Sequence, residues 1–195
     1  MSEAIEGLPV ERVVGCGISG ASFSPCRTYR YALWRNWGGL LPGANGYAMF
    51  VGLNPSTADE TEDDPTIRRC IGFAKAWGYA GLCMTNLFAF RATDPRVMKA
   101  ATDPVGEDND WTLQITAETA GVVVAAWGAH GTHMGRADAV RRMLPSLHYL
   151  RLTKDGHPGH PLYLPASLRP VPWQASNVPH NRQAAAANAA DDCPR

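Results

Sequence analysis

A polar loop follows directly after an apolar segment, and its asparagine is suited to hold a water molecule. The loop that follows residues 47–51 begins with Gly52, Leu53, Asn54, Pro55 and Ser56. A short apolar run that ends at Gly and Pro is typical of a buried strand that leads into a tight turn. Because an amide side chain both donates and accepts hydrogen bonds, Asn54 is a candidate for orienting a nucleophilic water. The alternative is that Asn54 and Pro55 only form the turn that ends the strand.

A second polar loop, at residues 156–163, carries two histidines three residues apart, His157 and His160. The prolines beside them exclude a regular helix, so the imidazoles are presented from a loop. A metal site is the rival explanation for the pair. The sequence offers no clear third and fourth ligand for it, so we expect no metal and no cofactor.

The hydrophobic pattern predicts strands that alternate with helices. Strands are predicted at residues 29–35, 47–53, 81–88, 121–127 and 147–152, and helices at residues 65–77, 108–120 and 135–144. Asp64 followed by Pro65 is a typical helix start. Such alternation favours a parallel sheet with helices on both faces. We therefore expect an α/β fold, a three-layer αβα sandwich around a central, mainly parallel sheet of four to five strands.

Composition limits the organisation of the chain. Its 195 residues, 45% of them hydrophobic, suit one domain. We assign that domain to residues 26–173, with an N-terminal extension at 1–25 and a disordered tail at 174–195. The five cysteines are odd in number and widely spaced, which argues against a disulfide framework. With no signal peptide and no long apolar segment, we expect a cytoplasmic monomer without membrane contact.

Polar segments follow each predicted strand, and in a parallel α/β sheet the strand ends form the ligand crevice. These segments are residues 52–64, 85–91, 127–131 and 153–164. Thr85 and Asn86 are candidates for ligand contact, with strand-end hydrogen bonding as the alternative. Asp59, Asp63 and Asp64 offer carboxylates for acid–base chemistry, with helix capping and solvent exposure as the alternative for two of the three.

Four motifs, taken in chain order, resemble the uracil-DNA glycosylase superfamily, in particular its mismatch-specific, thymine-glycosylase-like branch. They are Gly52-Leu53-Asn54-Pro55, Thr85-Asn86, Trp127-Gly128 and His160-Pro161. Over about residues 29–165 the chain more closely resembles a bacterial and phage family of domains of unknown function that is related to this superfamily. The segments of that closer resemblance are residues 54–59, 64–66, 85–87 and 159–163.

The resemblance implies hydrolysis of an N-glycosidic bond in DNA. Asn54 would hold the attacking water, and His160 would donate to the base carbonyl or steady the adjacent phosphate. Asn86 would read the base edge, and Asp59 would act as a base or stabilise the sugar cation. Gly52, Leu53, Pro55, Ser56 and Tyr163 complete the implied substrate site.

Uracil-specific members of the superfamily place an aromatic residue soon after the first motif, and here Ser56, Thr57 and Ala58 follow it. An open wall admits a group on the fifth carbon of the base, because exclusion requires a clash. A 5-substituted pyrimidine is the expected substrate, and glucosylated hydroxymethylcytosine of phage DNA would make the activity an anti-phage defence. The alternatives are a uracil or mismatch repair glycosylase, a nucleotide- or nucleoside-processing enzyme, and a non-catalytic module that binds modified DNA.

DNA with a flipped base is the expected partner, although Lys plus Arg and Asp plus Glu balance at 18 each. Contact must then come from a local basic patch rather than from net charge. The expected DNA-binding residues are Arg68, Arg69, Arg91, Arg96 and Lys154. Stacking on an aromatic side chain would offset part of the cost of base extrusion.

Overall fold

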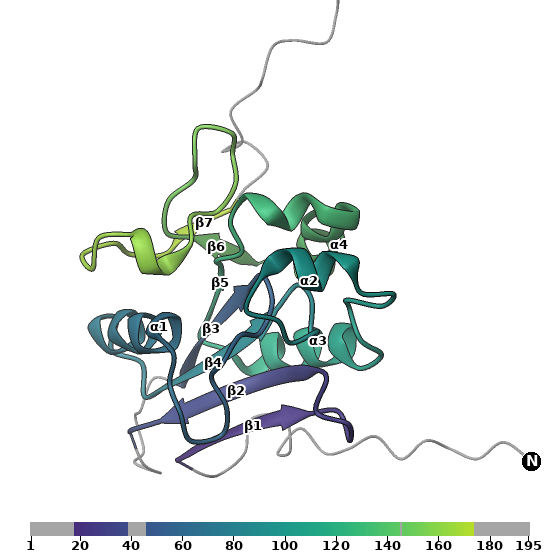
Figure 1. Cartoon of the computed structure of the whole chain (residues 1–195). Helices are drawn as coiled ribbons and strands as arrows, with labels where there is room; N and C mark the ends of the chain where they lie inside the picture. The colour runs from purple at the N-terminus through teal and green to yellow at the C-terminus, as the bar shows by residue number, and fades with distance from the viewer. Residues whose placement is uncertain (1–17, 39–45, 145, 174–195) are drawn as a thin grey trace, which may run out of the picture.

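A seven-stranded sheet carries helices on both faces (Figure 1) in a computed structural model that describes residues 18–38, 46–144 and 146–173. The strands are β1 (Ser19–Phe23), β2 (Arg30–Asn36), β3 (Tyr47–Gly52), β4 (Gly81–Asn86), β5 (Val122–Ala125), β6 (Leu147–Tyr149) and β7 (Val171–Pro172). The helices are α1 (Pro65–Ala76), α2 (Pro95–Ala100), α3 (Asn109–Thr119) and α4 (Arg136–Met143), with 3₁₀ segments at Ala129–Gly135 and Pro161–Tyr163.

The sheet is mixed, with strand order β1-β2-β4-β3-β5-β6-β7. Its centre, β4-β3-β5-β6, is parallel, whereas β1, β2 and β7 pair in antiparallel fashion. The predicted α/β class is confirmed. The predicted count of four to five mainly parallel strands is not, because antiparallel strands extend the sheet at both edges.

The two strands that the sequence did not predict, β1 and β7, carry little sequence signal. β1 has the sequence Ser-Gly-Ala-Ser-Phe, and β7 has two residues, one of them Pro172. β1 falls within the stretch assigned to an N-terminal extension (residues 1–25), yet it pairs along its length with β2. Residues 1–17 of that extension and the predicted tail at 174–195 lie outside the described residues.

Alternation along the buried central strand β3 divides the core between the two faces of the sheet. Ala48 and Phe50 pack in the cluster that includes the buried face of α1, whereas Met49 and Val51 pack in the cluster that includes α3 and α4. Within α1 the buried side chains recur at helical spacing, at Ile67, Cys70, Phe73 and Ala74. Both faces of the sheet are therefore covered by helices, with α1 on one side and α3 and α4 on the other (Figure 1).

The parallel centre of the sheet aligns the ends of three strands. Gly52, the last residue of β3, pairs with Asn86, the last residue of β4, and Val51 pairs with Ala125 of β5. The loops that leave these strands therefore begin at one edge of the sheet. None of the helices in the described part of the chain has the length and apolar character that a membrane span needs.

Candidate functional site

A cavity of about 390 Å³ lies where β3, β4 and β5 end. That volume falls in the range of ligand pockets, roughly 300–1,000 Å³. Eight of the candidate residues proposed from the sequence line it: Gly52, Leu53, Asn54, Ser56, Asp64, Asn86, His160 and Tyr163. The parallel register thus brings together side chains from three segments that are far apart in the chain.

The amide of Asn54 is held in a fixed orientation. Its Nδ2 donates to the carbonyl oxygen of Ala92 at 2.7 Å and to that of Pro55 at 3.1 Å. Because a carbonyl oxygen only accepts, these bonds settle which end of the amide is nitrogen. Both bonds use Nδ2, so Oδ1 is left to accept a hydrogen bond from a water or a ligand.

Asn86 lines the cavity and carries a buried donor. The residue is 3% exposed, and its Nδ2 has no hydrogen-bond partner among the described residues. A Cβ atom on Gly52 would lie 2.7 Å from Asn86 Oδ1, so only glycine allows the two strand ends to approach this closely. A buried donor without a partner is unfavourable by about 1–3 kcal/mol, and a ligand acceptor in the cavity would remove that penalty.

His160 begins the 3₁₀ segment Pro161–Tyr163 and faces the cavity as a neutral donor. Its Nδ1 accepts from the backbone N–H of Leu162 at 3.4 Å, which places the proton of the neutral ring on Nε2. Burial lowers the pKa of His160, and the negative charge of Asp64 acts in the opposite direction. Tyr163, which is 81% exposed, packs its ring 5.6 Å from the imidazole. The pair forms a donor beside a stacking surface at the rim.

We expect an NMR titration of the His160 ring to give a midpoint below the ordinary value of about 6.5, because burial outweighs Asp64. A lowered folded-state pKa means that this ring favours folding above about pH 6.5 and that its contribution is lost as pH falls below that value. The spectrum of a His160→Gln variant assigns the signal by its disappearance. A midpoint above the ordinary value would contradict the assignment of His160 as a neutral hydrogen-bond donor.

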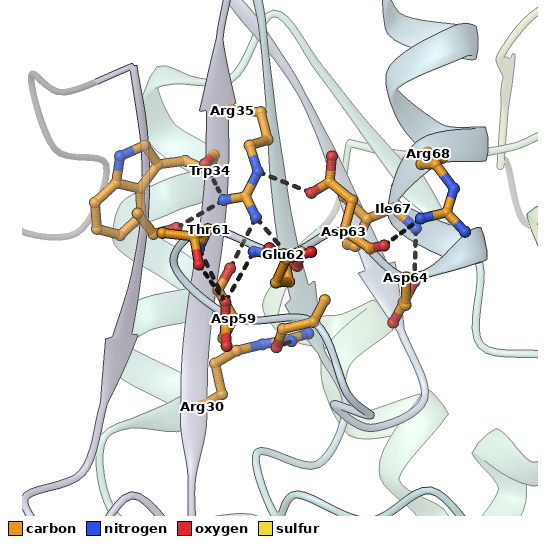
Figure 2. Close-up of polar contacts among 12 residues, drawn as sticks. Arg30, Trp34, Arg35, Asp59, Thr61, Glu62, Asp63, Asp64, Ile67 and Arg68 are labelled. Carbon is orange, nitrogen blue, oxygen red and sulfur yellow. Dashed lines mark hydrogen bonds and ion pairs between the residues drawn. The ribbon is translucent and has the colours of Figure 1, made fainter.

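The predicted carboxylate Asp59 does not line the cavity, whereas Asp64 does. Asp59 Oδ1 accepts from the backbone N–H groups of Thr61 and Glu62 at 2.9 and 2.8 Å, and these bonds lower its pKa (Figure 2). Asp59 therefore stabilises a turn. Asp64 Oδ1 caps α1 by accepting from the N–H of Ile67 at 2.9 Å, which leaves Oδ2 for a ligand.

Two buried arginines of β2 hold the loop between β3 and α1. Arg35 donates to Asp63 Oδ1 at 2.8 Å and to the carbonyl oxygen of Asp59 at 2.7 Å, and Figure 2 shows it at the centre of the loop's polar contacts. Arg30, 2% exposed, donates to the carbonyl oxygen of Ala58 at 2.5 Å. Burial lowers the pKa of Arg30 to about 10, so it keeps its charge at neutral pH.

Several sequence-based assignments take different places in the structure. Ala58 is 1% exposed and belongs to the core, and Pro55 is buried without lining the cavity. Of the expected wall, Ser56 alone faces the cavity, while Thr57 lines a neighbouring cleft. His157 is outside the cavity, and its backbone N–H donates to Thr153 Oγ1 at 3.2 Å.

Some of the expected DNA-binding side chains already bond to other groups of the protein, and others are exposed or line a cleft. Arg68 donates to the carbonyl oxygen of Asp63, and Arg69 donates to that of Leu164. The exposed Arg96 pairs with Asp94 at 2.7 Å. Lys154 is exposed, and Arg91 lines the neighbouring cleft. The arginines of α1 are thus engaged with the fold itself.

Sequence reasoning gave no role to four polar residues of the cavity: Arg30, Thr66, Thr93 and His130. Arg30 belongs to strand β2, and no local motif in that strand distinguishes it as a site residue. Thr93 precedes α2, a helix of six residues that the hydrophobic pattern did not reveal. The position of His130, two residues after the Trp127-Gly128 motif, was the one available signal. Its Nδ1 lies 3.2 Å from Lys99 Nζ.

A family described as "Protein of unknown function (DUF1643)" matches residues 30–162. The chain belongs to this family. No curated protein and no solved structure matches the chain. The DUF1643 match includes the strands and loops that build the cavity and ends beside Tyr163.

Within the described residues, no group of three or more His, Cys, Asp or Glu side chains is placed to hold a metal ion.

Proposed function

We propose that this DUF1643 protein is a DNA glycosylase related to the uracil-DNA glycosylase superfamily, which hydrolyses the N-glycosidic bond of a 5-substituted pyrimidine. The observation that carries the proposal is the convergence of Asn54, Asn86 and His160 on one cavity of about 390 Å³. Helices on both faces of a sheet with a parallel centre support the three-layer αβα sandwich expected from the alternation of strands and helices.

In the proposed reaction Asn54 Oδ1 accepts a hydrogen bond from the attacking water and so fixes it beneath the anomeric carbon. The water oxygen forms a bond to that carbon, and the bond to the base nitrogen breaks with its electron pair leaving on the base. Asp64, whose Oδ2 is not used by the helix cap, stabilises the positive charge on the sugar and takes the water's proton. An abasic site and a free base result.

The other cavity residues act on the base. The Nδ2 of Asn86 donates to a base carbonyl and so satisfies a donor that is buried without a partner in the described structure. The Nε2–H of His160 donates to the carbonyl on which negative charge develops as the base leaves. Tyr163, exposed at the rim beside His160, stacks on the extruded nucleotide.

The substrate class rests on Ser56, the part of the expected small wall that lines the cavity. We expect single-turnover release of glucosylated hydroxymethylcytosine or hydroxymethylcytosine from duplex DNA to exceed release of uracil. Ser56→Tyr should slow release of the substituted bases at least about tenfold through a clash, while uracil is spared. Thr102→Tyr, at an exposed position that lines neither cavity nor cleft, is the control for added bulk. Fastest release of uracil by the wild-type protein would favour repair over phage defence.

The same assays separate the remaining alternatives. A module that only binds modified DNA would release no base from any of these duplexes. A nucleotide- or nucleoside-processing enzyme would act on the free compounds and not on the duplex. In the proposal the protein acts as a cytoplasmic monomer on DNA, without cofactor, metal or membrane.

A further inference from the structure

A second cleft adjoins the proposed base cavity and has a different chemistry. Its volume is about 610 Å³. Its lining consists of two arginines, four hydroxyl side chains and one alanine: Arg27, Arg91, Thr28, Ser56, Thr57, Thr93 and Ala92. This lining contains no carboxylate. Ser56, Ala92 and Thr93 also line the base cavity, so the two spaces share a wall.

The two arginines are held in place by one shared aromatic ring and by a hydrogen bond from Arg91 to the backbone of Arg27. The guanidinium carbons of Arg27 and Arg91 lie 4.0 and 4.9 Å from the centre of the Phe23 ring. Arg91 Nη1 donates to the carbonyl oxygen of Arg27 at 3.1 Å. Arg91 Nε is buried and has no partner within the described part of the chain. The cation is thus fixed in position while part of its donor capacity is unused.

Arg27 carries a counter-ion that is easily displaced. Its Nη1 and Nη2 bind Glu60 Oε1 and Oε2 at 2.7 and 3.0 Å. The side chains of Arg27 and Glu60 are 52% and 40% exposed, and an ion pair this exposed contributes little to stability. The guanidinium of Arg27 thus forms a bidentate pair of hydrogen bonds with a carboxylate. The same paired geometry suits two oxygens of a phosphate.

We propose that this cleft binds the phosphate of the nucleotide whose base occupies the adjoining cavity, and that Glu60 competes with the phosphate for Arg27. Fixed guanidinium groups together with several hydroxyl donors, and no carboxylate in the lining, match the oxygens of a phosphate ester. Ser56 and Thr93 line both spaces, so a phosphate in the cleft would lie next to the sugar of the nucleotide whose base is in the cavity. The choice of a DNA phosphodiester as the ligand rests on the proposed function.

The test measures binding of a labelled duplex with one 5-hydroxymethylcytosine by fluorescence anisotropy, in Asn54→Ala protein so that no base is released. We expect Arg91→Gln to weaken binding about tenfold and to reduce the slope of log K against log salt by about 1. Glu60→Gln should tighten binding about threefold, an effect that damage to the fold would not produce. Arg142→Gln, an exposed position near the end of α4 that lines neither space, is the charge-matched control.

Competition with free compounds identifies the source of the phosphate. Stronger competition by 5-hydroxymethyldeoxycytidine monophosphate than by the nucleoside, lost in Arg91→Gln, supports the phosphate site. Displacement of the duplex by equimolar monophosphate would make the free nucleotide the ligand and overturn the choice of DNA. Unchanged affinity and salt slope in both Arg91→Gln and Glu60→Gln would overturn the site itself. Absence of base release by wild-type protein, with Arg91-dependent binding intact, would refute the glycosylase alone.

Discussion

Asn54→Ala is expected to lower single-turnover base release by at least about two orders of magnitude, because the attacking water loses the acceptor that positions it. The substitution also frees the carbonyl oxygens of Pro55 and Ala92, to which Asn54 Nδ2 donates. Loss of these bonds should reduce the free energy of unfolding by about 1 kcal/mol. The folded protein should still bind the duplex, because the cleft arginines remain.

Thr61→Ala is the matched control for this experiment. Thr61 lies on the same loop, where its hydroxyl donates to Asp59 Oδ1 at 3.2 Å, and it lines neither cavity nor cleft. Base release should be close to wild type in this variant. Near-normal release by Asn54→Ala, measured beside Thr61→Ala, would remove Asn54 from the mechanism.

Arg35→Met is expected to reduce the free energy of unfolding by about 3 kcal/mol, the largest stability effect that we anticipate. Arg35 is 8% exposed and connects β2 to the loop through Asp63 and the carbonyl oxygen of Asp59. Removing the guanidinium leaves Asp63 without its partner and the carbonyl without its donor. Chemical denaturation, followed by the midpoint and its slope, measures the loss.

Arg68→Met removes an α1 guanidinium that contacts the same loop and serves as the comparison. Arg68 is exposed and donates to the carbonyl oxygen of Asp63 (Figure 2). We expect a change within about 0.5 kcal/mol, as for other surface substitutions. Equal destabilisation by the two variants would mean that burial of Arg35 does not decide the strength of its contacts.

The local elements of the fold follow closely from the sequence. Helix α1 begins at Pro65 after Asp64, and the strand at residues 47–53 is β3, within one residue of its observed end. Both are encoded by neighbouring residues, through apolar periodicity and a capping side chain. The strand partners are not local. Residues 30–36 form a strand that pairs antiparallel with β4, and nothing within the segment specifies that direction.

In the candidate site, too, the local features followed from the sequence and the contacts between distant segments did not. The sequence by itself determined that polar loops follow the central strands, and it selected Asn54, Asn86 and His160, because short motifs mark them. Only the tertiary structure decided which neighbours share their cavity: Arg30 rather than Ala58, and Asp64 rather than Asp59. The physical reason is that a loop side chain faces a cavity or a turn according to contacts with distant segments. Here the arginines of β2 set that choice by holding the loop's carbonyl groups from across the sheet.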